Sequence, residues 1–217
     1  MLLGQKNAGE AVKMFQALDK VKPGAGLPLL AVAWLAGGEQ DKALALAKAR
    51  IDEQPASASG YMLEAAIHQR LGAVDKAEAA LTQGLVRAKD AQLLSLQLGS
   101  LYAGTGRVPK ALETFAALRK AQPDFVPAIF ALGALLDQQG DKGKAVELYK
   151  EVLAKAEDHT AALNNLAYLY ADNYGTPEEA LVLAVKAFRK EPGNPGILDT
   201  LGLALFKNGR HDEAVNV

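Results

Sequence analysis

Residues 92–123, QLLSLQLGSLYAGTGRVPKALETFAALRKAQP, contain the pattern that decides the fold. Six of the first eleven residues are leucine or tyrosine, and they cover most faces of a helix, as expected for a helix packed on two sides. Gly104 and Gly106 predict the end of this helix, because glycine accepts the left-handed conformation that helix C-termini favour. The chain is therefore expected to turn here within a few residues.

A second helix is predicted to begin at Pro109, since proline is tolerated in a first helical turn. Its apolar stripe consists of Ala111, Leu112, Phe115 and Leu118. The alanine belongs where two helices cross most closely, because a larger side chain would push their axes apart. The segment then ends at Pro123, twelve residues after the alanine.

The same pattern of glycine and alanine recurs along the chain. Six of seven regularly spaced alanines follow a glycine by five residues, which predicts one all-α repeat array without strands. The alanines are Ala11, Ala43, Ala77, Ala111, Ala145, Ala180 and Ala214. The expected division is a partial unit 1–23, units 24–57, 58–91, 92–125, 126–159 and 160–194, and a partial unit 195–217. The segment Thr176 to Glu179 has the pattern of a capping box at a helix start.

Composition excludes several classes of protein. The formal net charge is −1 and lysines alternate with acidic residues, so a polyphosphate partner is not expected. The chain has no cysteine, which excludes disulfides and thiolate metal sites and fits either the cytoplasm or a bacterial periplasm or envelope. Its most apolar stretch, Leu27–Leu35, is far shorter than the ~20 residues that span a bilayer. We expect a soluble protein without direct membrane insertion, in a compartment that the sequence leaves open.

A helix-turn-helix unit of 34 residues, with Leu-Gly and Tyr in its first helix and Ala, Phe and a closing Pro in or after its second, resembles the tetratricopeptide repeat. The resemblance covers the whole chain. It implies a right-handed superhelix, an α-solenoid of antiparallel helix pairs, whose first helices line a concave groove that binds a peptide or a partner protein.

A narrower resemblance rests on residues near the C-terminus. The segments 164–168, 176–179 and 197–202 are similar to the last repeats of bacterial envelope tetratricopeptide proteins. That group includes lipoproteins linked to exopolysaccharide export and to the PEP-CTERM sorting system. The resemblance implies a place in an envelope assembly.

If the first helices line a groove, side chains fifteen, eleven and eight residues before each alanine point into it, with a shift of one where a unit has an extra residue. Lysines are missing from these positions, so clamping of a terminal carboxylate is not expected. Two alternatives stay open: the larger apolar members belong to the core between repeats, or Asn164 and Asn165 bridge neighbouring repeats. The candidate partner-binding residues are Met62, Gln69, Leu96, Ser100, Phe130, Asp137, Asn164, Tyr168 and Asp199.

The sequence favours no enzymatic, cofactor or metal site. His68, His159 and His211 lie one to a repeat, and we expect the first to be packed and the other two to be solvated near turns. The loop from Gly140 to Lys144 lacks the spacing of a phosphate-binding loop. The acidic residues of the second helices are expected to be solvated on the outer side, and they are Glu78, Glu113 and Glu147.

Three hypotheses follow for function. The first is a non-enzymatic scaffold that binds a protein or peptide in its groove. The second is a structural subunit of a bacterial envelope or secretion assembly. The third is an RNA-binding helical repeat with Asn164 and Asp199 as base readers, which the near-zero net charge opposes.

The ends of the sequence suggest a piece of a longer array. Met1 is expected in the middle of a first helix, with Lys6 in the place of a turn glycine, and Val217 follows Ala214 by three residues. Repeat arrays need polar terminal caps, so end-to-end self-association is the expected secondary consequence.

Overall fold

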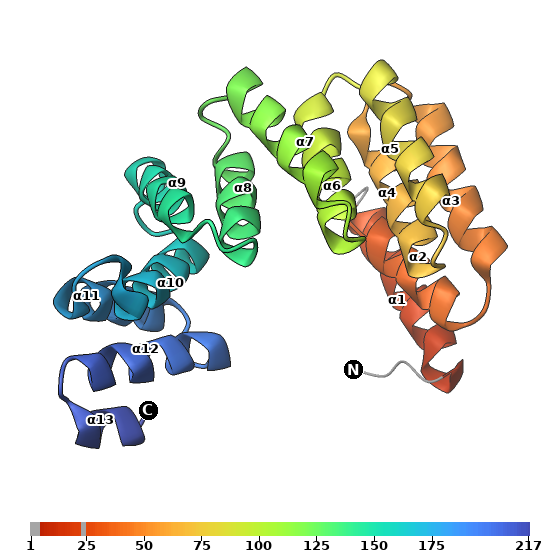
Figure 1. The fold of residues 1–217 in the computed structure, drawn as a ribbon. Helices are drawn as coiled ribbons and strands as arrows, with labels where there is room; N and C mark the ends of the chain where they lie inside the picture. The colour runs from red at the N-terminus through yellow and green to blue at the C-terminus, as the bar shows by residue number, and fades with distance from the viewer. Residues whose placement is uncertain (1–4, 23–24) are drawn as a thin grey trace. The chain divides into compact units, whose positions relative to one another are not determined.

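The computed structural model describes residues 5–22 and 25–217. The described residues form thirteen α-helices and one π-helical turn without any strand, which confirms the all-α prediction (Figure 1). None of these helices is both long enough and apolar enough to cross a membrane. The elements are α1 (Gln5–Val21), α2 (Leu27–Ala36), α3 (Gln40–Glu53), α4 (Ala58–Arg70), α5 (Val74–Arg87), α6 (Ala91–Gly104), α7 (Val108–Ala121), α8 (Val126–Gln138), α9 (Lys142–Lys155), α10 (Thr160–Leu169), η1 (Tyr170–Tyr174), α11 (Pro177–Lys190), α12 (Pro195–Lys207) and α13 (His211–Val215).

Contacts divide the chain into two compact units, one ending at Arg107 and one beginning at Val108. In the first unit, α1 packs on α2, α2 on α3, and α4 on both α3 and α5. In the second unit, α8 pairs with α9, α10 with α11, and α12 with α13. Each unit is therefore built from helices that are neighbours in sequence. The division of the chain into seven repeats remains a prediction.

The alanines of the repeat pattern lie in the tightest places. Ala43, Ala77, Ala145 and Ala180 have no exposed surface. In the α8–α9 pair, Tyr149 is fully buried four residues after Ala145. Ala214 is only partly buried, in the five-residue helix α13.

Glycine allows close helix contact at two positions inside helices. A Cβ atom added to Gly133 in α8 would lie 3.2 Å from the Leu148 Cβ of α9. One added to Gly84 in α5 would lie 2.8 Å from the Tyr61 Cβ of α4. Gly133 belongs to a Leu-Gly pair of a first helix, and its missing side chain lets α8 and α9 approach each other.

The turn glycines adopt the expected left-handed conformation in every repeat except one. Gly38, Gly72, Gly106, Gly140 and Gly209 have φ between 72° and 84°. In the unit with 35 residues the prediction is wrong, because the extra residue forms the π-helical turn η1 and Asn173 takes the positive φ of 74°.

Gly175 has a different role in this unit. Its φ is −160°, and an added Cβ would lie 2.4 Å from the Tyr170 ring. The glycine therefore makes room for an aromatic ring and does not supply a left-handed turn.

Helix ends follow the predicted signals. The Thr176 hydroxyl accepts a hydrogen bond from the Glu179 N–H, and the Glu179 carboxylate accepts one from the Thr176 N–H, so the capping box is confirmed. The helices α3, α7 and α11 end two residues before Pro55, Pro123 and Pro192. At the start, Lys6 lies in the first turn of α1, whereas Pro23 and the expected first-helix residues 1–4 lie outside the described residues.

Ion pairs join residues about one repeat apart in sequence. Glu78 in α5 pairs with Arg107 and accepts a hydrogen bond from the Tyr102 hydroxyl, so its predicted solvation on the outer surface is wrong. Glu113 and Glu147 are exposed, as expected. Within the second unit, the corresponding pairs are Arg119–Glu151, Lys142–Asp172, Lys155–Asp124 and Lys190–Asp158, at 2.5–2.6 Å.

The buried alanines generate a direct test. Replacing Ala77 by leucine should overpack the α4–α5 crossing and lower the free energy of unfolding by ~1–3 kcal/mol. Ala79 lies on the exposed side of the same helix, so Ala79→Leu should change it by less than ~0.5 kcal/mol. Urea denaturation followed by circular dichroism measures both, and equal midpoints would show that Ala77 is not a packing constraint.

The unusual turn at η1 generates a second test. Gly175→Ala should force the Tyr170 ring to move and destabilise the protein by ~1–3 kcal/mol. Asn173→Gly should leave stability within ~0.5 kcal/mol, because glycine adopts a positive φ freely. Thermal unfolding measures the two variants, and a larger loss for Asn173→Gly would reverse the assigned roles.

Candidate functional site

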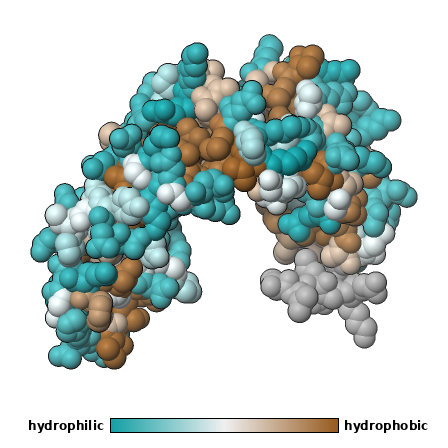
Figure 2. Space-filling model, in the orientation of Figure 1, coloured by the Kyte–Doolittle hydropathy of each residue, from teal (hydrophilic) through white to brown (hydrophobic). Residues whose placement is uncertain are grey.

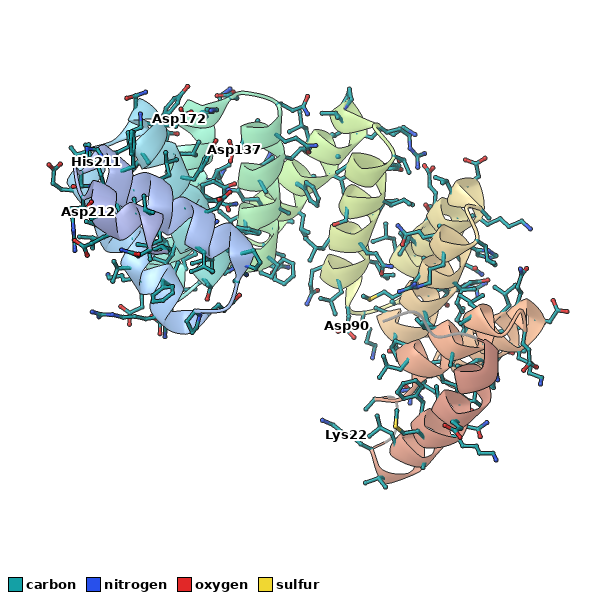
Figure 3. All side chains as sticks on the ribbon, turned by 90° about the horizontal axis from the view of Figure 1, so that it is seen from below. Lys22, Asp90, Asp137, Asp172, His211 and Asp212 are labelled. Atoms are coloured by element: carbon teal, nitrogen blue, oxygen red, sulfur yellow. The ribbon has the colours of Figure 1, made fainter. Side chains whose placement is uncertain are left out.

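The second unit contains an open groove of about 880 Å³ between α10, α12 and the C-terminal residues. Asp137, in the last turn of α8, reaches it from a third helix and is labelled in Figure 3. Figure 2 shows apolar surface among hydrophilic residues over α12 and α13. The lining comprises Asp137, Asn164, Asn165, Tyr168, Pro195, Gly196, Leu198, Asp199, Thr200, Gly202, Leu203, Phe206, Ala214 and Val217.

Local helix geometry sets the two walls. Asn164 and Tyr168 are four residues apart in α10 and therefore project from one face. Asp199 and Leu203 repeat this spacing in α12, and Phe206 follows three residues later. The tyrosine side chain is 46% exposed and the phenylalanine side chain is 56% exposed.

Helix capping fixes where each wall begins. The His159 Nδ1 atom accepts a hydrogen bond from the Ala162 N–H at 3.2 Å and caps α10. The Asn194 side chain accepts one from the Gly196 N–H at 3.1 Å and caps α12. The start of each wall is therefore set by a side chain that precedes the groove residues.

The two neighbouring asparagines have different roles. Asn165 donates a hydrogen bond to the Tyr149 hydroxyl at 3.0 Å, and that hydroxyl lies 3.4 Å from a carboxylate oxygen of Asp137. Asn165 thus bridges α10 to α9, as one sequence alternative proposed. The Asn164 Oδ1 atom is buried and accepts no hydrogen bond in the described structure.

Burial controls the ionisation of this network. It raises the pKa of the Tyr149 phenol to about 12, so the hydroxyl remains protonated. Burial also raises the pKa of Asp137, an effect that the charge of Lys142 opposes. Lys142 itself pairs with Asp172 in the π-helical turn. The Asp137 carboxylate therefore lies in the groove without a cation in direct contact among the described residues.

Four of the nine predicted residues meet in this groove: Asp137, Asn164, Tyr168 and Asp199. Phe130 lies apart from them, with its ring centroid 5.8 Å from that of Tyr149 and 4.8 Å from that of His159. This contact ties Phe130 to neighbouring helices, as the core alternative proposed.

The other four predicted residues belong to the first unit. Gln69 and Ser100 are exposed, whereas Met62 and Leu96 are partly buried. The Met62 carbonyl accepts a hydrogen bond from the side chain of Gln97, and the Leu96 carbonyl accepts one from Ser100. A binding role for these residues remains a prediction.

Sequence period alone missed part of the groove. Asn165 and Leu198 each stand next to a predicted position, and Ala214 comes from the following helix. The double asparagine was the signal for Asn165. Nothing in the period indicates that α13 contributes to the groove, because this depends on how the last helix folds back.

Chemically, the groove offers hydrogen-bond acceptors beside apolar walls. The described residues include no group of three side chains that could hold a metal ion. His159 is partly buried as a helix cap, which corrects its predicted solvation, whereas His211 is exposed and its ring centroid lies 4.9 Å from that of Phe206. His68 is partly buried, as expected. The acceptors and apolar walls of the groove suit binding of a ligand that carries hydrogen-bond donors.

Comparison with known proteins gives relatives of the same kind. The chain is 35% identical over 81 residues to the photosystem I assembly protein Ycf3 of a Synechococcus species, a match that covers 36% of this chain and 46% of the relative. The chain spans less than half the length of the curated relatives it matches.

Solved structures share the fold. The structure of pilF from Pseudomonas aeruginosa has a TM-score of 0.71 at 14% identity and covers 97% of this chain and 90% of its own. YrrB, described as a tetratricopeptide protein with an unusual peptide-binding site, has a TM-score of 0.54 at 18% identity and covers 92% of this chain and all of its own. The narrower resemblance to envelope proteins remains a prediction.

The model of the tetratricopeptide repeat family matches residues 62–124 and 130–195, more than half of the sequence. Proteins with this repeat bind protein or peptide partners. The family match agrees with the helix pairs, the buried alanines and the glycine turns. The chain belongs to the tetratricopeptide repeat family.

Proposed function

We propose that the protein is a non-enzymatic scaffold that binds an extended segment of a partner protein in the groove between α10 and α12. The observation that carries this proposal is the Asn164 side chain, whose buried oxygen has no hydrogen-bond partner beside exposed Tyr168. Leaving such an acceptor unpaired costs ~1–3 kcal/mol. A half-turn of the amide exchanges its oxygen and nitrogen, so either can bond to a peptide backbone.

The groove walls supply the remaining binding energy. Tyr168 and Phe206 are large, exposed and placed on facing helices, and aromatic side chains contribute disproportionately to protein interfaces. Leu203 lies on the same helix face as Phe206. A peptide with apolar side chains would cover these surfaces while its backbone bonds to Asn164.

The names of one curated relative and one structural neighbour support a general role in binding other proteins or peptides. One structural neighbour is described as having a peptide-binding site, and one curated relative is named as an assembly protein. The second candidate, a structural subunit of an envelope or secretion assembly, would use the same groove against a sister subunit. The third, RNA binding, is opposed by the carboxylates of Asp137 and Asp199, which repel phosphate groups.

The Asp137 carboxylate also supports a binding role. Because its folded-state pKa is raised, ionisation of this group is less favourable in the folded protein than in the unfolded chain. The charge therefore reduces stability near neutral pH. Groups that lower the stability of the folded state are characteristic of functional surfaces, because residues selected for function are often unfavourable for folding.

Peptide selection tests the proposed function. The immobilised protein should enrich related sequences from a random-peptide phage library, and Tyr168→Ala should weaken binding of the corresponding synthetic peptides about tenfold or more. Tyr174→Ala is the matched control, because Tyr174 is also 46% exposed but does not line the groove. Fluorescence anisotropy measures the affinities. Peptides that bind Tyr168→Ala as tightly as the native protein would contradict the proposal.

The cost of the Asp137 charge generates a separate prediction. Asp137→Asn should raise the melting temperature at pH 7, because it removes the ionisation that folding disfavours while keeping an oxygen near Tyr149. The gain should shrink as the pH falls below the raised pKa of Asp137 and vanish once the carboxyl is protonated in both states. Calorimetry across this range measures it, and a stabilisation independent of pH would exclude this cause.

A further inference from the structure

The two side chains of the groove lining that carry a charge at neutral pH are both acidic, namely Asp137 and Asp199. Neither forms an ion pair in the described part of the chain. This differs from the loops and second helices of the same unit, where Asp124, Asp158 and Glu151 each pair with a lysine or arginine. These three acidic groups are thus neutralised by basic residues of a neighbouring repeat, whereas the two groove carboxylates form no ion pair among the described residues.

No lysine forms an ion pair with these carboxylates among the described residues, although the charge of Lys142 lowers the pKa of Asp137. Lys142 donates a hydrogen bond to Asp172, and Lys207 also acts electrostatically on Asp172. Asp172 lies in the π-helical turn and is labelled with Asp137 in Figure 3. Lys142 therefore bonds to a third carboxylate outside the groove lining, and it acts on Asp137 through its charge without a hydrogen bond.

The walls of the groove suit the stem of a basic side chain. Lysine and arginine carry an apolar chain below their charge, which packs against surfaces such as Leu203 and Phe206. A cation also interacts favourably with the face of an exposed aromatic ring, here Tyr168 or Phe206. Asp199 is exposed in the same groove and can accept charge-assisted hydrogen bonds.

We propose that this groove recognises a basic side chain, with arginine preferred, in an extended segment of the partner protein. The inference rests on the proposed function and adds the charge of the bound segment. Arginine is preferred because its guanidinium presents five N–H donors, whereas Asp137, Asp199 and the Asn164 oxygen are all acceptors. Charge complementarity of this kind selects one class of partner and repels acidic ones.

Three synthetic tripeptides test the inference: acetyl-Phe-Arg-Leu-amide, its citrulline analogue and its glutamate analogue. Citrulline has nearly the shape of arginine but no charge. Titration into ¹⁵N-labelled protein, followed by amide chemical shifts, should place the arginine peptide on α10 and α12. The citrulline and glutamate peptides should bind at least about tenfold more weakly. Equal binding of the arginine and citrulline peptides would overturn the inference.

Variants locate the charge effect. Asp199→Asn and Asp137→Asn should each reduce the affinity for the arginine peptide several-fold and leave the citrulline peptide unchanged. Asp158→Asn is the matched control, because Asp158 pairs with Lys190 outside the groove, and it should leave both affinities unchanged. Circular dichroism verifies that each variant is folded. If Asp158→Asn weakens binding as much as the groove variants, the effect is general charge and the inference is wrong.

Phage selection separates this inference from the proposed function. Selected peptides that lose affinity for Tyr168→Ala and contain arginine or lysine support both. Selected peptides that lose affinity for Tyr168→Ala but contain no basic residue support the scaffold function and overturn the basic-side-chain inference. A single-stranded RNA oligonucleotide that displaces the arginine peptide from the groove would overturn both.

Discussion

Helix pairs in this protein depend on contact across a single methyl group. Ala77 and Ala145 are fully buried where a second helix packs on the first, and no larger side chain fits without separating the two axes. Glycine acts in the same way at Gly84 and Gly133, where a neighbouring side chain occupies the space that a Cβ would need. Within each unit, these residues set how closely the paired helices pack.

The positions of the groove residues follow from these crossings. Asn164 and Tyr168 face the groove because the opposite side of α10 carries buried Leu163, Leu166 and Ala167. Asn165 also lines the groove, and its hydrogen bond to the Tyr149 hydroxyl ties the groove wall to the preceding repeat. Packing contacts and the groove lining therefore share a helix: Asn165 bonds to the preceding repeat, and Asn164 lines the groove.

The sequence predicted the fold in detail because its strongest signals are local. Gly106 and Thr176 act through backbone conformation and hydrogen bonds within a few residues, so their roles could be recognised without a structure. Gly175 was assigned wrongly because the Tyr170 ring lies against it only after the extra residue forms a π-helical turn. The predicted solvation of Glu78 was wrong for a related reason, since its partner Arg107 is 29 residues away.

The candidate site was predicted only in part. The helical period identified Asp137, Asn164, Tyr168 and Asp199, which line one groove of the second unit. It could not tell that Phe130, at an equivalent position, packs against Tyr149 and His159 instead. Period specifies the face of a helix, whereas the contacts on that face depend on residues from other repeats.

The π-helical turn has a consequence for how such arrays change length. An extra residue inside a helix would rotate every later side chain by about 100°, since one turn contains 3.6 residues. Here the extra residue is absorbed between Tyr170 and Tyr174, before the capping box that restarts the next helix at Pro177. Both helix faces keep their orientation. This turn therefore shows how a repeat array gains one residue without changing the register of the repeats that follow.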